Sequence, residues 1–330
     1  MKEEDVKMGK RALITGVNGM VGSHMADFLL EKGYKVYGTS RNINIESPNT
    51  KHLKGQIELI QVDLNDQTSI YKAVELSNPD EIYNFGAVSF APNSWITPEY
   101  TANVNGLAVL RILEVIKQYN KDIRFYQAST SEIFGNLKNT TANEDTIPYP
   151  KSPYGVAKLY AQWIIKNYRE SYGLFACNGI SFNHESERRG IEFVTRKITK
   201  SVAEIKLGLR DKIELGNLDV SRDWGYAPDY VEAMWLMLQA DKPDDYVLAT
   251  NTSNTLDNLL QISFNKVGIT DYKSYIEINP KFVRVNEIHN LKGDYSKINQ
   301  QLGWKPKTPF QAMIERMVAN DLNIYPKFIC

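Results

Sequence analysis

The sequence predicts an α/β protein with a doubly wound parallel sheet followed by a smaller C-terminal domain. Short apolar segments alternate with longer segments of helical periodicity up to about residue 182. A glycine-rich turn, Gly16 to Gly22, follows the first apolar segment. Beyond residue 182 the elements become shorter and are interrupted by glycines and prolines. Because strands that alternate with helices pair in parallel, the first part predicts a Rossmann-type sheet.

The predicted elements follow one another with short connections. The expected strands are residues 11–15, 35–39, 57–62, 81–85, 124–128 and 174–182. Helices are expected to begin near residues 20, 66 and 99, to span 152–171, and to lie between Asp294 and Gly303. We assign residues 1–182 mainly to the dinucleotide-binding domain and 183–330 mainly to the substrate-binding domain, with some later chain crossing back to the sheet. Strands that end at Thr15, Phe85, Ala128 and Phe182 should supply one site, because such sheets bind ligands at their carboxyl ends.

Composition excludes several classes of partner. The 330 residues are 42% hydrophobic and 24% charged, which is typical of a globular chain with one or two cores. Basic and acidic residues both number 39, so no net field attracts nucleic acid or a membrane surface. Cys177 and Cys330 form neither a disulfide framework nor a metal-ligand spacing. With a charged N-terminus and no long apolar segment, we expect a cytoplasmic protein without a metal.

The glycine-rich turn predicts a dinucleotide site. Its residues Gly16, Asn18, Gly19, Met20, Val21 and Gly22 lie where a strand leads into a helix, so backbone amides and the helix dipole can meet a pyrophosphate. Arg41 follows the second strand, where an NAD site usually has a carboxylate, and this favours NADP. Arg41 is also compatible with a solvated loop charge. Asp63 and Leu64 could meet the adenine, although an aspartate there also suits a turn.

A Tyr-x-x-x-Lys pair and a hydroxyl-rich strand end predict proton transfer coupled to hydride transfer. Tyr154 and Lys158 are one helical turn apart, so the ammonium should lower the pKa of the phenol. Thr130 would hydrogen-bond the same sugar hydroxyl as Tyr154. The alternatives without a catalytic role are a surface pair for Tyr154 and Lys158 and a turn cap for Thr130.

Glu132 indicates elimination, because alcohol oxidation alone has no need for an extra carboxyl group. In the cycle we expect, Tyr154 and NADP oxidise C4 of a sugar, Glu132 removes the acidic C5 proton and expels water from C6, and the hydride returns to C6. The alternative role for Glu132 is that of an exposed neighbour of a helix start.

Long stretches of the chain resemble the GDP-mannose 4,6-dehydratase family of the extended short-chain dehydrogenase/reductase superfamily. The likeness runs from about Arg11 to Leu322. Its most specific parts are residues 124–135 (RFYQASTSEIFG), 152–160 (SPYGVAKLY), 183–186 (NHES), 193–199 (FVTRKIT), 215–219 (LGNLD), 222–225 (RDWG) and 229–237 (DYVEAMWLM).

The resemblance implies roles for individual residues. Thr130, Glu132 and Tyr154 match the catalytic positions. The positions matching NADP contacts are Tyr100, Lys158, His184 and Arg189. We also expect Phe85, Gly86, Ala87 and Ser89, at and after a strand end, to contact the cofactor. The positions matching GDP-sugar contacts are Ser131, Asn183, Val194, Lys197, Leu215, Gly216, Arg222, Arg284 and Glu287. Arginine and lysine among them suit a diphosphate.

The chain also departs from the family pattern. Met20 and Val21 replace a usual Gln-Asp, the usual Ala-Ala-Gln-Ser-His segment is Gly86-Ala-Val-Ser-Phe90 here, and the region 271–281 is shorter. An altered pocket wall at Phe90 and Trp95 could admit a GDP-linked heptose in place of GDP-mannose. Helices starting near Glu99 and Ser152 resemble those that pair in a four-helix bundle, so we expect a homodimer or homotetramer.

Three alternatives stay open from sequence. An NADPH-dependent 4-keto-sugar reductase would use the same tyrosine and lysine, and so would an epimerase or decarboxylase of the superfamily. A cofactor-binding protein without catalysis would keep the sheet alone. Glu132 argues against the reductase, and the intact set of Thr130, Glu132, Tyr154 and Lys158 argues against loss of catalysis.

Overall fold

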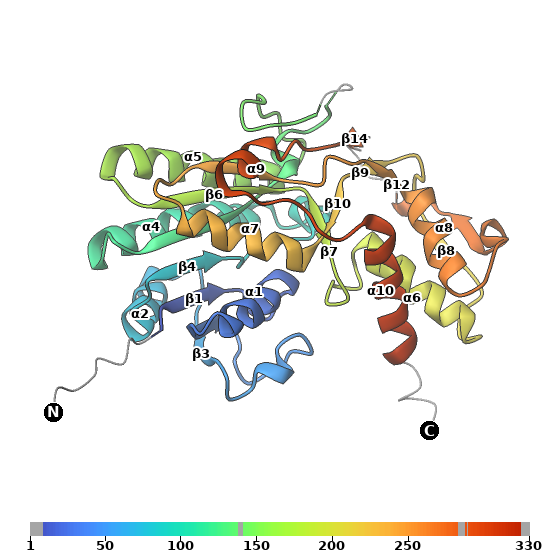
Figure 1. The fold of residues 1–330 in the computed structure, drawn as a ribbon, viewed down its shortest axis with the longest axis horizontal. Helices are drawn as coiled ribbons and strands as arrows, with labels where there is room; N and C mark the ends of the chain where they lie inside the picture. The colour runs from blue at the N-terminus through green and yellow to red at the C-terminus, as the bar shows by residue number, and fades with distance from the viewer. Residues whose placement is uncertain (1–8, 138–140, 283–287, 289, 325–330) are drawn as a thin grey trace.

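The computed structural model describes residues 9–137, 141–282, 288 and 290–324, and its central feature is a parallel sheet (Figure 1). Within these residues the sheet has seven strands in the order β11-β6-β5-β4-β1-β2-β3. All neighbouring pairs are parallel. The strands are β1 (Arg11–Thr15), β2 (Lys35–Ser40), β3 (Glu58–Gln61), β4 (Glu81–Asn84), β5 (Arg124–Thr130), β6 (Ala176–Ser181) and β11 (Asp245–Leu248). The strand order reverses beside β1, so the predicted doubly wound α/β fold is confirmed.

Helices cover both faces of the sheet. On one face lie α1 (Met20–Glu31) and α7 (Ala227–Gln239); on the other lie α2 (Gln67–Ser77), α4 (Ala108–Tyr119) and α5 (Pro153–Tyr172) (Figure 1). Successive strand residues face opposite layers: Ile82 packs in the α2, α4 and α5 layer, while Tyr83 packs in the α1 and α7 layer. A strand buried on both faces needs apolar residues at consecutive positions, which explains the continuous apolar segments of the sequence.

The helix expected from about Glu99 is divided. It consists of α3 (Pro98–Ala102), a π-helical turn (Asn103–Leu107, η3) and α4. Gly106 lies in this turn, and a Cβ there would come within 3.2 Å of the Tyr160 ring and 3.3 Å of the Ala157 carbonyl oxygen. The turn therefore packs closely against α5.

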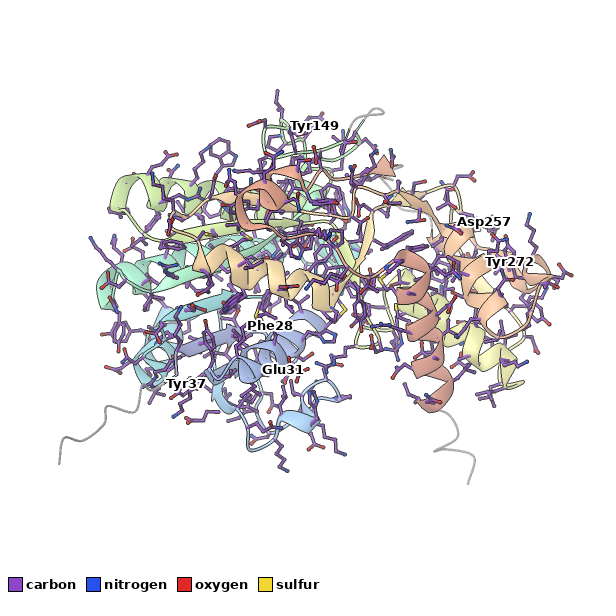
Figure 2. All side chains as sticks on the ribbon, viewed as in Figure 1. Phe28, Glu31, Tyr37, Tyr149, Asp257 and Tyr272 are labelled. Carbon is purple, nitrogen blue, oxygen red and sulfur yellow. The ribbon has the colours of Figure 1, made fainter. Side chains whose placement is uncertain are left out.

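The later half of the chain forms a smaller lobe and also returns to the sheet (Figure 1). Strand β11 is an edge of the sheet, α7 packs on α1, and α9 (Ser296–Leu302) packs on β11 and α7. The lobe contains α6 (Val194–Lys206), α8 (Leu256–Lys266) and α10 (Phe310–Ile324) around one apolar core. Figure 2 labels Asp257 and Tyr272 there, where the tyrosine hydroxyl donates to the carboxylate at 2.9 Å.

Short strands and helical turns complete the described chain. The strands are β7 (Asn183–Glu185), β8 (Ile213–Leu215), β9 (Ser221–Arg222), β10 (Trp224–Tyr226), β12 (Asn254–Thr255), β13 (Ile276–Ile278) and β14 (Asn290–Leu291). The 3-10 turns are η1 (Lys51–Leu53), η2 (Ala91–Trp95), η4 (Ser131–Ile133), η5 (Tyr272–Tyr275) and η6 (Pro280–Phe282). None of the helices in the described residues combines the length and apolarity needed to cross a bilayer.

Candidate active site

The carboxyl ends of β1 and β4 are tied together by one side chain. The hydroxyl of Thr15 accepts the backbone N–H groups of Phe85 at 3.1 Å and Gly86 at 2.9 Å, and it donates to the side-chain oxygen of Asn84. These bonds hold the loop after β4 against the glycine-rich turn. Phe85 itself packs on Tyr126 with ring centroids 5.8 Å apart, so its side chain supports the site from the core.

The glycine-rich turn is too crowded for side chains at two positions. Gly16 has φ of +66°, and a Cβ on Gly22 would lie 2.4 Å from the Gly16 carbonyl oxygen. Gly19 is the N-cap of α1, so the amides of the first helical turn are available to an anion. Met20 is 6% exposed and Val21 packs against the core, so at both predicted positions the backbone is the part turned to this site.

A cavity of about 180 Å³ adjoins this turn. The guanidinium of Arg41 at its wall donates to the Tyr100 hydroxyl at 2.7 Å. Asp63 accepts the N–H of Asn65 at 2.9 Å, which is the turn-forming role considered from sequence, while also lining the cavity. The lining residues are Gly16, Asn18, Thr39, Ser40, Arg41, Val62, Asp63, Leu64, Gly86, Ala87, Val88, Tyr100 and Val104. Ser89, predicted with this group, is exposed and lies outside that lining.

Helix α5 carries the Tyr154 and Lys158 pair. It begins where Ser152 caps it, the serine hydroxyl accepting the N–H of Gly155 at 3.1 Å, with Pro153 in the first turn. The ammonium of Lys158 donates to the Ala128 carbonyl oxygen of β5 at 2.9 Å and lies 5.9 Å from the centroid of the Tyr154 ring. Desolvation by burial lowers the pKa of Lys158 to about 8.

The expectation that Lys158 lowers the pKa of the Tyr154 phenol is wrong for this structure. Desolvation raises the pKa of Tyr154 to about 12, and the Glu132 carboxyl adds to the rise. A hydrogen bond with Thr130 and the charge of Arg189 act in the opposite direction. The physical reason is that burial of the phenol outweighs the nearby positive charge, while the Lys158 ammonium is bonded to a strand carbonyl oxygen.

Glu132 lies beside the tyrosine, as the pattern predicted. It is half-buried in the turn after β5, and the Ser152 hydroxyl donates to its Oε2 at 3.3 Å. The Thr130 hydroxyl accepts the backbone N–H of Glu132 at 3.3 Å, so Thr130 does cap a turn while also bonding Tyr154. Ser152 was expected from sequence only as the start of a helix, and its role as a partner of Glu132 was missed. A serine before proline at a helix start was the available signal for a side chain that faces the site.

His184 and Arg189 come from the segment around β7. The Nδ1 of His184 lies 2.8 Å from the Phe182 carbonyl oxygen and its ring stacks on Tyr230 with centroids 5.1 Å apart. Desolvation lowers the pKa of His184 to about 4, so the ring is neutral at pH 7. Arg189 pairs with Glu185, with Nε 3.0 Å from Oε2.

The predicted sugar-nucleotide residues are distributed over the facing lobe. Asn183 lies on β7, Val194 and Lys197 on the first turns of α6, and Arg222 on β9. Leu215 is 2% exposed in the lobe core, so its backbone and Gly216 are the parts that could meet a ligand. Ser131 is buried in the turn beside Glu132. Arg284 and Glu287 lie outside the described residues.

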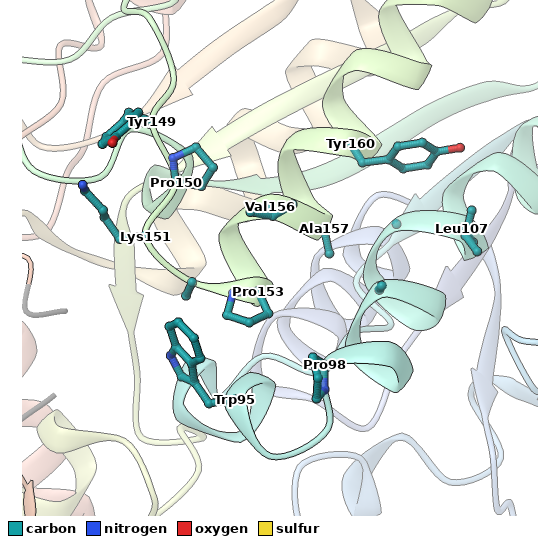
Figure 3. A pocket seen from close by; sticks show the side chains of 13 residues that line it. Trp95, Pro98, Leu107, Tyr149, Pro150, Lys151, Pro153, Val156, Ala157 and Tyr160 are labelled. Carbon is teal, nitrogen blue, oxygen red and sulfur yellow. The ribbon is translucent and has the colours of Figure 1, made fainter. Parts of the chain in front are cut away.

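A second, more open cavity of about 760 Å³ lies over α3, the π-helical turn and the start of α5 (Figure 3). Its rim includes Trp95, Leu107, Tyr149, Val156 and Tyr160, which are between 38% and 66% exposed. Such a run of exposed apolar side chains is unusual for a surface that faces water alone.

The fold and the site define a dinucleotide-binding protein of the short-chain dehydrogenase/reductase type. The profile of the family described as GDP-mannose 4,6 dehydratase matches residues 13–317. The chain belongs to this family. GDP-mannose 4,6 dehydratase 1 of Arabidopsis thaliana is 46% identical over 332 residues, 97% of this chain and 91% of the relative. The human GDP-mannose 4,6 dehydratase is 44% identical over 350 residues, 97% of this chain and 94% of the relative.

The fold is also similar to solved structures. The UDP-glucose 4-epimerase of Thermus thermophilus, solved as a complex with NAD, superposes with a TM-score of 0.83 at 25% identity. The match covers 94% of this chain and 98% of the epimerase.

Proposed function

We propose that this protein is a nucleotide-sugar 4,6-dehydratase that converts a GDP-linked sugar, GDP-mannose or a close relative such as a GDP-heptose, to its 4-keto-6-deoxy product. The observation that carries the proposal is the half-buried Glu132 beside Tyr154 and Thr130. A tyrosine and a lysine suffice for oxidation of an alcohol, whereas loss of water needs an additional acid and base.

The residues present fit NADP. A Cβ on Gly22 would lie 2.4 Å from the Gly16 carbonyl oxygen, so α1 packs directly on the glycine-rich turn, and the amides at its Gly19 end are placed to meet a pyrophosphate. The cavity beside it ends at Ser40 and Arg41, and a cation at this position suits a 2′-phosphate better than a ribose diol. The cofactor, when bound, would take a hydride from C4 and return it to C6.

The protein residues would move the protons. In its phenolate form, which the charge of Arg189 and the positive charge of an oxidised nicotinamide would favour, Tyr154 would accept the proton of the C4 hydroxyl, with Thr130 orienting that hydroxyl. Once C4 is a ketone, the C5 proton is acidic, and the Glu132 carboxylate would remove it. The same carboxyl group would then protonate the departing C6 hydroxyl, so one proton passes from C5 to the leaving water. When the hydride returns to C6, the proton that Tyr154 took from the C4 hydroxyl would go to C5, which completes the product and restores the side chain. The Ser152 hydroxyl, 3.3 Å from Glu132 Oε2, would hold the carboxyl group in place.

The GDP part would bind at the facing lobe. Lys197 and Arg222 supply positive charge for the diphosphate. Burial lowers the pKa of Lys197, whose ammonium lies 3.6 Å from the centroid of the Phe282 ring, and an arriving phosphate would raise that pKa.

The assembly we propose is a homodimer, or a tetramer built from it, with the apolar rim of the second cavity as the contact. The cavity lies over α3, the π-helical turn and the start of α5, which belong to the helices whose counterparts pair in the resemblance described above. Replacing Val156 with Glu should shift the sedimentation coefficient of the purified protein toward that of a monomer. An unchanged coefficient, in a variant that melts like the parent, would exclude this face.

A substrate screen tests the activity. The protein is incubated with GDP-mannose and with a GDP-heptose, without added NADPH, and the products are weighed by mass spectrometry. Loss of one water from either sugar supports the proposal. Product that forms only as NADPH is oxidised would instead identify a reductase.

The variant Glu132→Gln tests the assigned acid. The amide keeps the shape of the side chain but cannot accept the C5 proton, so oxidation at C4 should persist while water loss falls by about 10²-fold or more. Exchange of deuterium into C5 and the transient reduced-cofactor fluorescence report the separate steps. Water loss at the parental rate would remove Glu132 from this role.

A further inference from the structure

Two phenylalanines join the two halves of the chain beside the predicted site. Phe90 lies in the loop after β4, two residues beyond Val88 of the cofactor-side cavity, and Phe193 is the N-cap of α6. Their ring centroids are 5.5 Å apart at an interplanar angle of 80°, which is the edge-to-face arrangement favoured by aromatic quadrupoles. We call Phe90 and Phe193 the aromatic bridge.

The aromatic bridge carries an arginine. The guanidinium carbon of Arg189 lies 3.5 Å from the centroid of the Phe193 ring, and its Nε lies 3.0 Å from Glu185 Oε2. Glu185 is 2% exposed and also accepts the Thr195 hydroxyl at 2.8 Å. Arg189 is thus held between an aromatic face and a fixed, buried carboxyl group.

Arg189 is also the cation that acts on the phenol. Its charge lowers the pKa of Tyr154, against desolvation and the Glu132 carboxyl, which both raise it. Lys158 on the same helix directs its ammonium to the Ala128 carbonyl oxygen. The contacts of Arg189 with Phe193 and Glu185 therefore fix a positive charge on the Tyr154 side of the site.

We infer that Phe90 and Phe193 are positioning residues that hold Arg189 on the Tyr154 side of the site for the 4,6-dehydration, an inference that rests on the proposed function. Phe90 stands where the resembling family usually has histidine. This chain therefore uses an apolar contact between the loop after β4 and α6 at that place. The side chains of the aromatic bridge contribute packing and a cation–π contact, and no proton.

Variants of the aromatic bridge separate positioning from simple packing. Phe193→Leu keeps an apolar side chain but removes the face under Arg189, whereas Phe193→Tyr keeps that face. For Phe193→Leu we expect kcat/KM at pH 7 to fall about five- to tenfold. Phe193→Tyr should behave like the parent. Tyr71→Leu is the matched control, because Tyr71 makes an edge-to-face contact with Tyr119, with centroids 6.0 Å apart, at α2 and α4.

A double-mutant cycle tests whether the two rings act together. Phe90→Leu should lower kcat/KM about threefold alone and add little to Phe193→Leu, because the contact is lost in either variant. Losses that multiply, or an equal loss for Phe193→Leu and Phe193→Tyr at every pH, would overturn the inference.

An NADPH titration followed by fluorescence keeps the test independent of turnover. If the parent protein dehydrates no GDP-sugar, the proposed function fails, and the cycle is then measured on cofactor affinity, since Arg189 is also a predicted cofactor contact. A non-additive weakening of about threefold by Phe90→Leu and Phe193→Leu, spared in Phe193→Tyr, supports the positioning of Arg189. Additive or absent effects on affinity would overturn it.

Discussion

Burial of the Lys158 ammonium is expected to lower the free energy of unfolding of this protein. The side chain is 4% exposed, and desolvation lowers its pKa from 10.5 to about 8. A folded-state pKa below the unfolded value means that the folded chain binds the proton less tightly. The penalty is therefore fully present below pH 8 and disappears as the pH rises through 10.5.

The variant Lys158→Met exposes this penalty. At about 1.36 kcal/mol per pH unit, the lowering of the pKa corresponds to an upper bound of about 3 kcal/mol. The lost bond to the Ala128 carbonyl oxygen offsets about 1 kcal/mol, a modest loss because that oxygen also accepts the Gln127 side chain at 2.8 Å. We expect Lys158→Met to raise the free energy of unfolding by about 1–2 kcal/mol at pH 7.

Urea unfolding of parent and variant at several pH values measures this difference. The gain at pH 7 should shrink as the pH approaches 10.5, while dehydration activity falls at every pH. Conservation of volume makes methionine the suitable replacement. A variant that is less stable than its parent by the same amount at pH 7 and at pH 10 would refute the reasoning, since it would mean that Lys158 is not a desolvated cation in the folded protein.

Three further perturbations follow from the geometry. Gly22→Ala should abolish NADPH binding in a fluorescence titration and destabilise the fold by about 2–4 kcal/mol, because its Cβ would lie 2.4 Å from the Gly16 carbonyl oxygen and push the glycine-rich turn away from α1; binding at parental affinity would contradict this role of Gly22. Arg41→Ala should weaken NADP binding about 10- to 100-fold while leaving NAD binding nearly unchanged, and an equal loss for both would place Arg41 outside the 2′-phosphate site. Desolvation lowers the pKa of His24 to about 3 and that of His184 to about 4, both below 6.5. Because the unfolded chain then binds more protons, the free energy of unfolding should fall as the pH drops from 6.5 toward 4, by about 1–2 kcal/mol per histidine between pH 6.5 and 5. This fall should be smaller in the double variant His24→Asn/His184→Asn, and an unchanged fall would contradict the lowered pKa of the two histidines.

Much of the fold could be predicted from local signals in the sequence. Apolar segments such as residues 11–15 and 81–85 could be identified because a strand buried on both faces needs no polar alternation. The helix start at Ser152 and Pro153 and the helix end at Gly303 were readable because capping depends on one or two residues. The interruption of the helix at Asn103–Leu107 was not readable, because it depends on packing against α5, which follows about 50 residues later in the chain.

The candidate site was predictable in content but not in its internal contacts. Motif spacing predicted that Glu132 and Tyr154 lie close together, because Glu132 follows the end of β5 and Tyr154 lies at the start of α5. The direction of the Lys158 ammonium toward Ala128 and the desolvation that raises the pKa of the Tyr154 phenol both depend on how deeply α5 is buried against β5. Spacing along a helix gives the side of the helix and not the partner that a long side chain reaches.

By itself, the sequence determined the order of strands and helices along the chain, the glycine-rich turn and the set of proton-transferring side chains, because each of these depends on residues close together in the chain. Only the tertiary structure decided which groups are in contact. Arg189 contacts Phe193 and Glu185, Phe90 contacts Phe193, and Lys158 donates to a strand carbonyl oxygen. The physical reason is that desolvation and charge pairing act over a few ångströms in space between residues that are far apart in sequence, and the pKa of a buried group follows from that surrounding.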